Sequence, residues 1–254
     1  MRINTLNPLN RNWGPNNGLV MRLLTLPHNS GGRQWFDIAG NSHGVLTSGP
    51  TWASNRRDGS LGGVKFDGTD DYVEVSSLPT VTDGLTWCLW SKLTANTSFP
   101  MMITAAGGGY WELRYEGGGN LNPGVYWNGA SAVSSSAVSL NSWNHIGVTV
   151  LSAGVADAVK LYVNGVQVAY NSGTFYSPTA IRLGQRYAGG FNFTGTMDDV
   201  CMWNRAISAT EIQAIYNDSR TGYSKSLNWI KPRVVTPAVA STNRIRRLVT
   251  AGGS

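Results

Sequence analysis

The sequence predicts an all-β protein, a two-sheet antiparallel jelly-roll sandwich with one short C-terminal helix and extended terminal arms. Turn signals recur at short intervals between runs of alternating apolar and polar residues, which is typical of sandwiches and jelly rolls. The composition agrees, because 31 glycines allow many tight turns, and ten tryptophans and ten tyrosines supply large side chains for a core. One sandwich of about 200 residues accounts for most of the chain.

Charge separates the parts of the chain. Residues 1–219 carry 13 lysines and arginines against all 14 acidic residues, a balance of −1. Residues 220–254 carry seven basic residues and no acid, a balance of +7. Residues 1–17 are rich in asparagine and proline and have no periodicity. We therefore divide the chain into an N-terminal arm (1–17), a jelly-roll domain (18–219) and a basic, extended C-terminal arm (220–254).

Residues 63–75 carry the clearest local signal and predict a hairpin. Asp67 and Gly68 lie between two short runs of strand-forming residues, and both residue types tolerate the positive φ angles that tight hairpin turns require. In the second run, 72–75, Tyr and Glu alternate with two valines. We expect the valines of this strand to face the core.

The same kind of pattern predicts the remaining strands. Asn-Gly pairs at 128–129 and 164–165 mark further turns. Strands are expected at residues 19–26, 86–92, 110–116, 125–127, 143–151, 158–163, 166–170, 181–184 and 195–203.

One helix is expected, over about residues 209–217. Ser208 and Glu211 have the spacing of a capping box, in which each side chain accepts a hydrogen bond from the backbone N–H of the other. Ile207 and Ile212 occupy the positions of a hydrophobic staple. Ile215 extends the apolar face, so this helix should pack on the sandwich.

Several segments together resemble the laminin-G-like jelly rolls of the concanavalin A-like lectin/glucanase superfamily. They follow the order of that family over roughly residues 19–217, and together they point to the fold much more strongly than to one function. The segments are 37–44 (DIAGNSHG), 64–75 (VKFDGTDDYVEV), 85–92 (LTWCLWSK), 142–149 (SWNHIGVT), 161–168 (LYVNGVQV), 181–184 (IRLG) and 195–208 (GTMDDVCMWNRAIS), with Glu211 after them.

No catalytic pattern stands out. Glycoside hydrolases of this superfamily carry a Glu-x-Asp-x-x-Glu pattern, which this sequence lacks. Such enzymes need two carboxylates, because one protonates the leaving oxygen while the other attacks or activates water. The histidines, His28, His43 and His145, have no recognisable nucleophile beside them in the sequence. We therefore expect a protein that is not an enzyme.

Calcium is the one metal to consider, because Asx/Gly loops offer the carboxylate and carbonyl oxygens that Ca²⁺ prefers. The resemblance implies that many relatives hold a structural calcium ion with the aspartate at the position of Asp198 and with loop carbonyls near the chain start. Asp199 stands in the same motif, and Asp37 opens a suitable loop. The alternative is that Asp37 caps a turn and Asp198 forms a salt bridge. The expected cofactor is thus none, or one structural Ca²⁺.

Carbohydrate binding requires exposed aromatic rings with polar neighbours. The loop-rich middle of the chain supplies candidates where relatives form their concave face, although strand alternation implies that about half of them point into the core. The candidates are Tyr110, Trp111, Tyr115, Tyr126 and Trp127.

The predicted function is that of a non-enzymatic structural or interaction protein, a virion (phage) surface or decoration component. The N-terminus has no apolar signal segment and no apolar run is long enough to cross a bilayer. We therefore expect synthesis in the cytoplasm, a place in a virion or assembled particle, and no membrane partner. The alternative is a carbohydrate-binding lectin module that recognises cell-surface glycans.

The terminal arms are predicted to dock on neighbouring subunits in a homo-oligomer or in a capsid or virion lattice. A cationic segment can also contact nucleic acid, whose binding weakens steeply with salt. Protein docking is favoured over nucleic acid, because this arm interleaves few aromatic residues among its cations. The candidate docking residues are Arg233, Arg244, Arg246 and Arg247.

The chain contains two cysteines, Cys88 and Cys201, which form one pair at most. Two cysteines this far apart make neither a disulfide framework nor a zinc-binding spacing. In a reducing cytoplasm we expect buried thiols, and the sequence leaves their pairing open.

Overall fold

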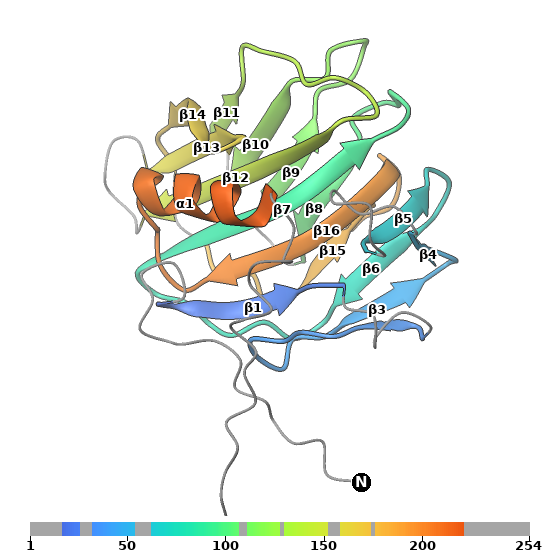
Figure 1. Cartoon of the computed structure of the whole chain (residues 1–254), viewed down its shortest axis with the longest axis horizontal. Helices are drawn as coiled ribbons and strands as arrows, with labels where there is room; N and C mark the ends of the chain where they lie inside the picture. Colours follow the sequence, from blue (N-terminus) through green and yellow to red (C-terminus); the bar gives the residue numbers. More distant parts are fainter. Residues whose placement is uncertain are drawn as a thin grey trace, which may run out of the picture.

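The computed structural model describes residues 17–25, 32–53, 62–106, 111–127, 130–151, 158–173 and 176–220. Within them, two antiparallel eight-stranded sheets pack face to face, and one helix lies on the outside of the first sheet (Figure 1). The predicted all-β sandwich with one short helix is confirmed. No helix among the described residues is long and apolar enough to cross a membrane. The two arms, 1–17 and 220–254, lie almost entirely outside the described residues.

The first sheet contains the longest strands. Its members are β1 (Leu19–Leu23), β4 (Thr51–Trp52), β5 (Val64–Asp67), β7 (Gly84–Leu93), β12 (Trp143–Leu151), β13 (Val159–Val163), β14 (Val166–Asn171) and β16 (Thr194–Trp203). They follow the order β14-β13-β12-β7-β16-β5-β4, and β1 also pairs with β16. The segments predicted at 86–92, 143–151 and 195–203 form its three longest strands.

The second sheet lies behind the first in Figure 1. Its members are β2 (Gln34–Trp35), β3 (Gly44–Thr47), β6 (Tyr72–Val75), β8 (Met101–Ala105), β9 (Trp111–Tyr115), β10 (Pro123–Trp127), β11 (Ala130–Val133) and β15 (Ile181–Leu183). They follow the order β11-β10-β9-β8-β15-β6-β3-β2.

The core fills the space between the sheets. Strand residues alternate between the core and the outside, because successive side chains of a strand point to opposite faces. Large aromatic side chains from both sheets meet there: Trp111 of β9 lies 5.6 Å from Trp87 of β7 and 5.3 Å from Trp127 of β10, measured between ring centroids. All three rings are buried. The abundant tryptophan is therefore explained largely by packing.

The helix α1 (Ala209–Arg220) covers the outer face of the first sheet. Its predicted capping box is confirmed: the Glu211 N–H donates to Ser208 Oγ at 3.2 Å, and the Ser208 N–H donates to Glu211 Oε2 at 2.8 Å. Ile207 and Ile212 are buried in a second, smaller core with Trp203. The sequence thus placed both the start of the helix and the face that it buries.

The predicted hairpin over residues 63–75 is wrong in its pairing. β5 belongs to the first sheet and β6 to the second, so the Asp67–Gly68 turn passes from one sheet to the other instead of joining paired strands. Asp67 Oδ1 accepts from the Thr69 N–H, Asp71 Oδ2 accepts from the Asp67 N–H, and Gly68 has a φ of +86°. The turn chemistry was read correctly. β5 and β6 pair with other strands and not with each other, because each buries its apolar residues in the core from a different sheet.

The Asn164–Gly165 turn does join a hairpin, as predicted. β13 and β14 pair with Val163 opposite Val166, and both turn residues have positive φ, +50° and +83°. These angles fit a turn whose two central residues both require the left-handed region.

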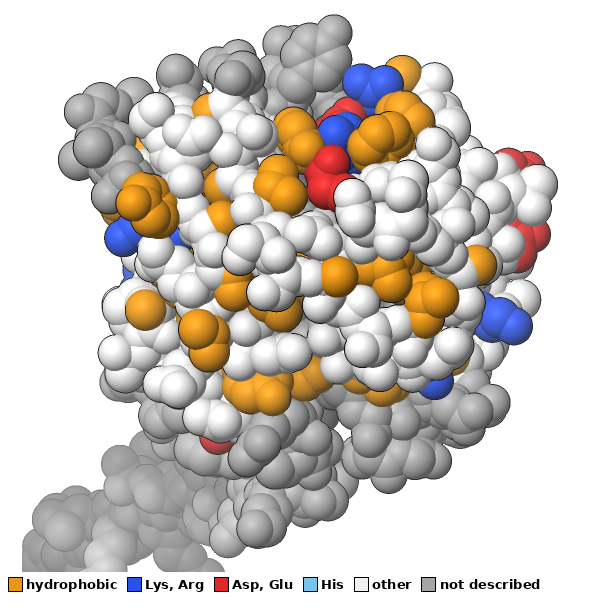
Figure 2. Space-filling model, turned by 90° about the horizontal axis from the view of Figure 1, so that it is seen from above, with side chains coloured by type: hydrophobic (Ala, Val, Ile, Leu, Met, Phe, Trp, Pro, Cys, Tyr) orange, Lys and Arg blue, Asp and Glu red, His pale blue; other side chains and the backbone are white. Residues whose placement is uncertain are grey.

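The face of the molecule seen in Figure 2 carries few charged side chains. In Figure 2 most of the visible side chains are uncharged, and positive and negative groups touch each other between hydrophobic side chains at one place near the edge of the view. Charged groups that gather on a face with few other charges mark a region to consider for function.

Candidate functional site

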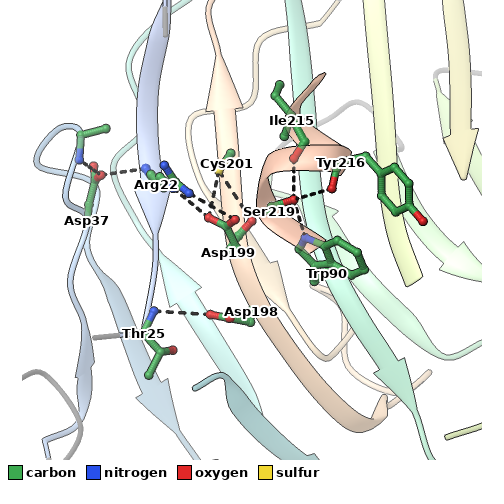
Figure 3. Close-up of polar contacts among 11 residues, drawn as sticks. Arg22, Thr25, Asp37, Trp90, Asp198, Asp199, Cys201, Ile215, Tyr216 and Ser219 are labelled. Carbon is green, nitrogen blue, oxygen red and sulfur yellow. Dashed lines mark hydrogen bonds and ion pairs between the residues drawn. The ribbon is translucent and has the colours of Figure 1, made fainter. Parts of the chain in front are cut away.

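The predicted calcium ligands lie near β1, and Figure 3 shows their contacts. Asp37 accepts four backbone hydrogen bonds. Its Oδ1 accepts from the N–H groups of Arg22, Ala39 and Gly40 at 2.8, 2.9 and 3.0 Å, and its Oδ2 accepts from that of Ser42 at 2.9 Å. Asp37 therefore caps the turn of its own loop and links that loop to β1. This arrangement agrees with the alternative considered above, in which Asp37 caps a turn.

Asp199 forms a largely buried ion pair with Arg22. Its Oδ1 accepts from Arg22 Nε at 2.8 Å and its Oδ2 from Arg22 Nη2 at 3.3 Å. Burial alone would lower the pKa of the Arg22 guanidinium, but the charge and hydrogen bonds of Asp199, together with the nearby Cys201 and Asp198, outweigh burial and the pKa is raised. Asp198, on the neighbouring position of β16, is fully buried and its Oδ1 accepts from the Thr25 N–H at 3.4 Å. A salt bridge of Asp198 stays a prediction, and the neighbouring Asp199 forms one with Arg22.

These contacts test whether calcium fits here. Ca²⁺ takes six to eight oxygen ligands whose lone pairs face the ion. The carboxylate of Asp37 is taken by four N–H donors, and that of Asp199 by a guanidinium that would repel a second cation. Asp37 and Asp199 therefore do not fit calcium and act as structural links. Participation of Asp198 in a calcium site stays a prediction.

Three of the predicted sugar-binding aromatics belong to the core, which corrects the prediction. Trp111, Tyr115 and Trp127 are at most 1% exposed. Tyr115 shares a hydrogen bond of 2.6 Å with Ser91 Oγ of the opposite sheet. The reason is strand alternation, because their positions on β9 and β10 point inward. Tyr126 is the candidate that points outward, and Tyr110 lies outside the described residues.

The outward positions of the second sheet form one continuous row. Strand register places Tyr126 opposite Glu112, Glu112 opposite Thr104, Thr104 opposite Arg182, and Arg182 opposite Glu74. Among the described residues no helix lies on this side, since α1 packs on the first sheet. We call this outer surface of the second sheet the arginine face, after Arg114, Arg182 and Arg186 and the groups that surround them.

The first part of the arginine face centres on Arg114 of β9. Its guanidinium carbon lies 3.8 Å from the ring centroid of Tyr126 and 4.6 Å from that of Phe99. Arg114 Nη1 donates to Glu112 Oε2 at 2.6 Å, and the Tyr126 hydroxyl donates to Glu116 Oε1 at 2.7 Å. We call Phe99, Arg114 and Tyr126 the first platform. All three are partly exposed.

Glu112 connects this platform to the loop after β15. Its Oε2 contacts Arg114 and its Oε1 lies 2.7 Å from Arg186 Nε, although its side chain is only 7% exposed. Arg186 in turn lies over the ring of Phe191, at 5.3 Å. One buried carboxylate therefore orients two guanidinium groups, and hydrogen bonds to charged groups are the stronger kind.

A second platform lies on the same face. The guanidinium carbon of Arg182 lies 4.2 Å from the ring centroid of Tyr72 and 4.5 Å from that of Tyr187. Arg182 Nε donates to Glu74 Oε2 at 3.1 Å, and its Nη1 donates to the Tyr187 carbonyl at 3.2 Å. We call Tyr72, Arg182 and Tyr187 the second platform, and its residues are also partly exposed.

Two aromatic residues at the edge of the arginine face have unusual backbone conformations. Phe99 and Phe191 both have a φ of +52°, and their rings meet edge to face with centroids 5.3 Å apart. A non-glycine residue held in the left-handed region costs about 1–3 kcal/mol, and such strain concentrates at binding sites and ligand clamps. The fold thus maintains these two rings at a cost in backbone energy.

The surroundings of Tyr126 keep its hydroxyl uncharged. Partial burial raises the pKa of Tyr126, and the hydrogen bond to Glu116 raises it further, because ionisation would remove the donated proton beside a carboxylate. Tyr126 therefore remains a neutral hydrogen-bonding group at physiological pH.

Sequence reasoning missed the arginines and glutamates of this face. Glu112 and Arg114 of β9 and Glu116, directly after this strand, occupy alternate positions, the spacing that places charged groups on one side of a strand. That alternation was available in the sequence and could have indicated a polar face beside Tyr126. The contributions of Phe99, Arg186 and Tyr187 come from loops, and no local pattern indicated them.

The fold and this polar, aromatic sheet face define a lectin-like β-sandwich protein. Residues 67–213 match the family model of the concanavalin A-like lectin/glucanases superfamily, and the chain belongs to that superfamily. The resemblance found in the sequence is thereby confirmed.

Solved structures with the same fold come from several kinds of protein. A sialidase of Trypanosoma rangeli aligns with a TM-score of 0.62 and 16% identity over 82% of this chain and 34% of its own. Domain 4 of an extracellular GH43 arabinanase of Geobacillus stearothermophilus, in complex with arabinotriose, aligns with a TM-score of 0.63 and 16% identity over 78% of this chain and 98% of its own. The binding domain of a paraclostridial mosquitocidal protein gives 0.60 and 14%, over 80% and 53%.

These likenesses establish the fold alone, because all three identities are low. The present chain spans about a third of the sialidase chain and almost all of the arabinanase domain. A search of curated proteins finds no match.

Proposed function

We propose that this protein is a non-enzymatic carbohydrate-binding module and that its binding surface is the arginine face. The observation that carries the proposal is the pair of guanidinium–aromatic platforms, partly exposed and side by side on one sheet face. Aromatic rings offer apolar surface to the C–H side of a sugar, while a few fixed polar groups recognise its hydroxyls. The complex of the arabinanase domain with arabinotriose supports the proposal, since that domain has the same fold.

Catalysis is not part of the proposed function. Glycoside hydrolysis needs one carboxyl group that carries a proton and a second that attacks or activates water. Both oxygens of Glu112 are held in ion pairs, Oε2 with Arg114 and Oε1 with Arg186. Glu116 accepts the Tyr126 hydroxyl and lies 3.7 Å from Arg114 Nε. These glutamates serve to position arginine and tyrosine side chains.

Binding can be tested with a glycan array followed by titration calorimetry on the best ligand. We expect Tyr126→Ala to weaken binding about tenfold, the equivalent of roughly 1.4 kcal/mol for a lost aromatic contact. Tyr170→Ala is the matched control, because Tyr170 is 61% exposed on β14 of the other sheet. An array without any ligand, or equal losses in the two variants, would contradict the proposal.

A second candidate function is attachment within a particle, as a virion surface component. The charge contrast supports it: seven basic residues and no acid in 220–254 suit docking on a neighbouring subunit. The docking arginines, Arg233, Arg244, Arg246 and Arg247, lie outside the described residues. Native mass measurement of the full chain and of a chain ending at residue 219 tests this role. Loss of assembly with an intact monomer would support it, and a monomeric full chain would contradict it.

A further inference from the structure

The arginine face also indicates what kind of carbohydrate it would hold. Resting on the binding function proposed above, we infer that the ligand is a neutral, linear oligosaccharide that lies across the strands of the second sheet and contacts both platforms at once.

The distance between the two platforms indicates the length of the ligand. Arg114 belongs to β9 and Arg182 to β15, and β8 lies between these strands. Neighbouring strands are about 4.8 Å apart, so the two arginine-bearing strands are separated by roughly 10 Å. One sugar ring is too small to contact both platforms, whereas a chain of about three or more units reaches from one to the other. Such a chain crosses the strands obliquely, because Arg114 pairs with Met101 of β8 and Arg182 with Thr104.

The two platforms are also held in a fixed relation. Thr104, only 3% exposed, lies between Glu112 and Arg182 in the register row, so the row is closely packed. Arg186 pairs with Glu112 beside the first platform, and the next residue, Tyr187, belongs to the second. The loop that carries them is closed by hydrogen bonds between residues 186 and 189 and between 186 and 190. A preorganised pair of contacts of this kind costs little further ordering when a ligand binds.

Charge pairing indicates a neutral ligand. Arg114 and Arg186 share Glu112, Arg114 also lies near Glu116, and Arg182 pairs with Glu74. An acidic sugar would have to compete with these carboxylates for the same guanidinium groups. A neutral sugar can instead use the N–H and oxygen positions that remain, without disturbing the pairs.

The test uses neutral linear arabino-, xylo-, gluco- and manno-oligosaccharides of one to six units, measured by calorimetry on the full chain. For the series that binds, affinity should rise at least about tenfold from the disaccharide to the tetrasaccharide, as expected for one added aromatic contact. Tyr187→Ala should remove most of that gain. Tyr72→Ala, from the same platform, provides a second variant, and Tyr170→Ala should leave the length dependence unchanged. Near-ultraviolet circular dichroism confirms that each variant is folded.

The outcomes separate this inference from the function on which it rests. Equal affinity for mono- and tetrasaccharides, or tighter binding of the matching uronic-acid oligosaccharides, would overturn the inference and leave carbohydrate binding in place. A length dependence that survives both Tyr187→Ala and Tyr72→Ala would also overturn it. Binding of no oligosaccharide in any series would count against the proposed function itself.

Discussion

Cys88 of β7 and Cys201 of β16 lie directly opposite each other on paired strands, and both are free thiols in the smaller core beneath α1. Burial raises the pKa of both thiols, and the nearby charge of Asp199 raises it further. A thiol with a raised pKa forms little thiolate, which is the reactive species. Cys88 and Cys201 should therefore react slowly with thiol reagents in the folded protein.

The first prediction concerns the reactivity of these cysteines. Native protein should react with a thiol reagent such as dithionitrobenzoate at least about a hundredfold more slowly than urea-unfolded protein, because both thiols are buried and un-ionised. Spectrophotometry at 412 nm measures both rates. The melting temperature should be the same with and without dithiothreitol. Rapid labelling of the folded chain, or a fall in melting temperature on reduction, would show that one thiol is accessible or that the pair is oxidised.

The second prediction concerns the ion pair of Arg22 and Asp199. Asp199→Asn should lower the free energy of unfolding by about 3 kcal/mol, because it removes the carboxylate that pairs with the largely buried guanidinium of Arg22. Asparagine retains the shape of the side chain and tolerates the positive φ of this position, +53°. Urea unfolding followed by tryptophan fluorescence measures the loss.

The matched control for that variant is Asp70→Asn. Asp70 is exposed and its carboxylate lies within 4.8 Å of those of Asp67 and Asp71, so its removal relieves like charges. It should change stability by no more than about 0.5 kcal/mol. Equal effects of the two substitutions would contradict a special role for the Arg22 pair.

The third prediction concerns the loop closed by Asp37. Asp37→Asn should destabilise the protein by about 2 kcal/mol. The carboxylate now accepts hydrogen bonds from backbone N–H groups with both of its oxygens, whereas the asparagine NH₂ group would face one of these donors and could not accept from it. Chemical denaturation measures this change. Added calcium should not restore stability, since the contacts of Asp37 do not fit the ion. Recovery of stability in millimolar Ca²⁺ would contradict the structural assignment.

The fourth prediction concerns pH. Hydrogen bonds from Arg205 and, more weakly, from Ser208 lower the pKa of Glu211 to about 2. A carboxyl group whose pKa is lower in the folded state stabilises the fold at pH values above its unfolded pKa, and this stabilisation is lost as pH falls through the folded pKa. The contribution should therefore fade between about pH 4.5 and pH 2.

Comparison with Glu211→Gln isolates that contribution. At pH 6 the variant should be less stable by about 1 kcal/mol, the usual size of a helix cap, since water screens much of this partly exposed pair. Urea titrations at several pH values should show the difference shrinking toward pH 2. A difference that stays constant with pH would mean that the charge of Glu211 contributes nothing.

Sequence patterns predicted the elements of this fold well wherever the signal was local. The capping box of Ser208 and Glu211 and the Asn164–Gly165 turn depend on neighbouring residues, so they could be recognised directly. The Asp67–Gly68 turn was recognised too, but whether its strands pair is decided by distant partners in two different sheets. The residues of a turn determine its conformation, but they do not determine which strands pair on either side of it.

The candidate site was harder to predict for the same reason. Aromatic residue types suggested Trp111, Tyr115 and Trp127, yet the phase of the strand alternation sends them inward, and phase depends on which face meets the core. Arg186 and Tyr187 reach the arginine face from a loop, through contacts with Glu112 and Arg182 that come from elsewhere in the chain. Such long-range contacts leave no local trace in the sequence.

The register row that crosses the second sheet continues from Glu74 to Val45 and Gln34, so its members come from positions between Gln34 and Arg182 in the chain. Some neighbours in the row are far apart in the sequence: Thr104 of β8 lies opposite Arg182 of β15, for example. No short fragment of the chain contains both. Affinity for the oligosaccharide proposed above should therefore report on completion of folding. A chain truncated within β15 should not bind it, and recovery of this binding during refolding should coincide with the final assembly of the domain.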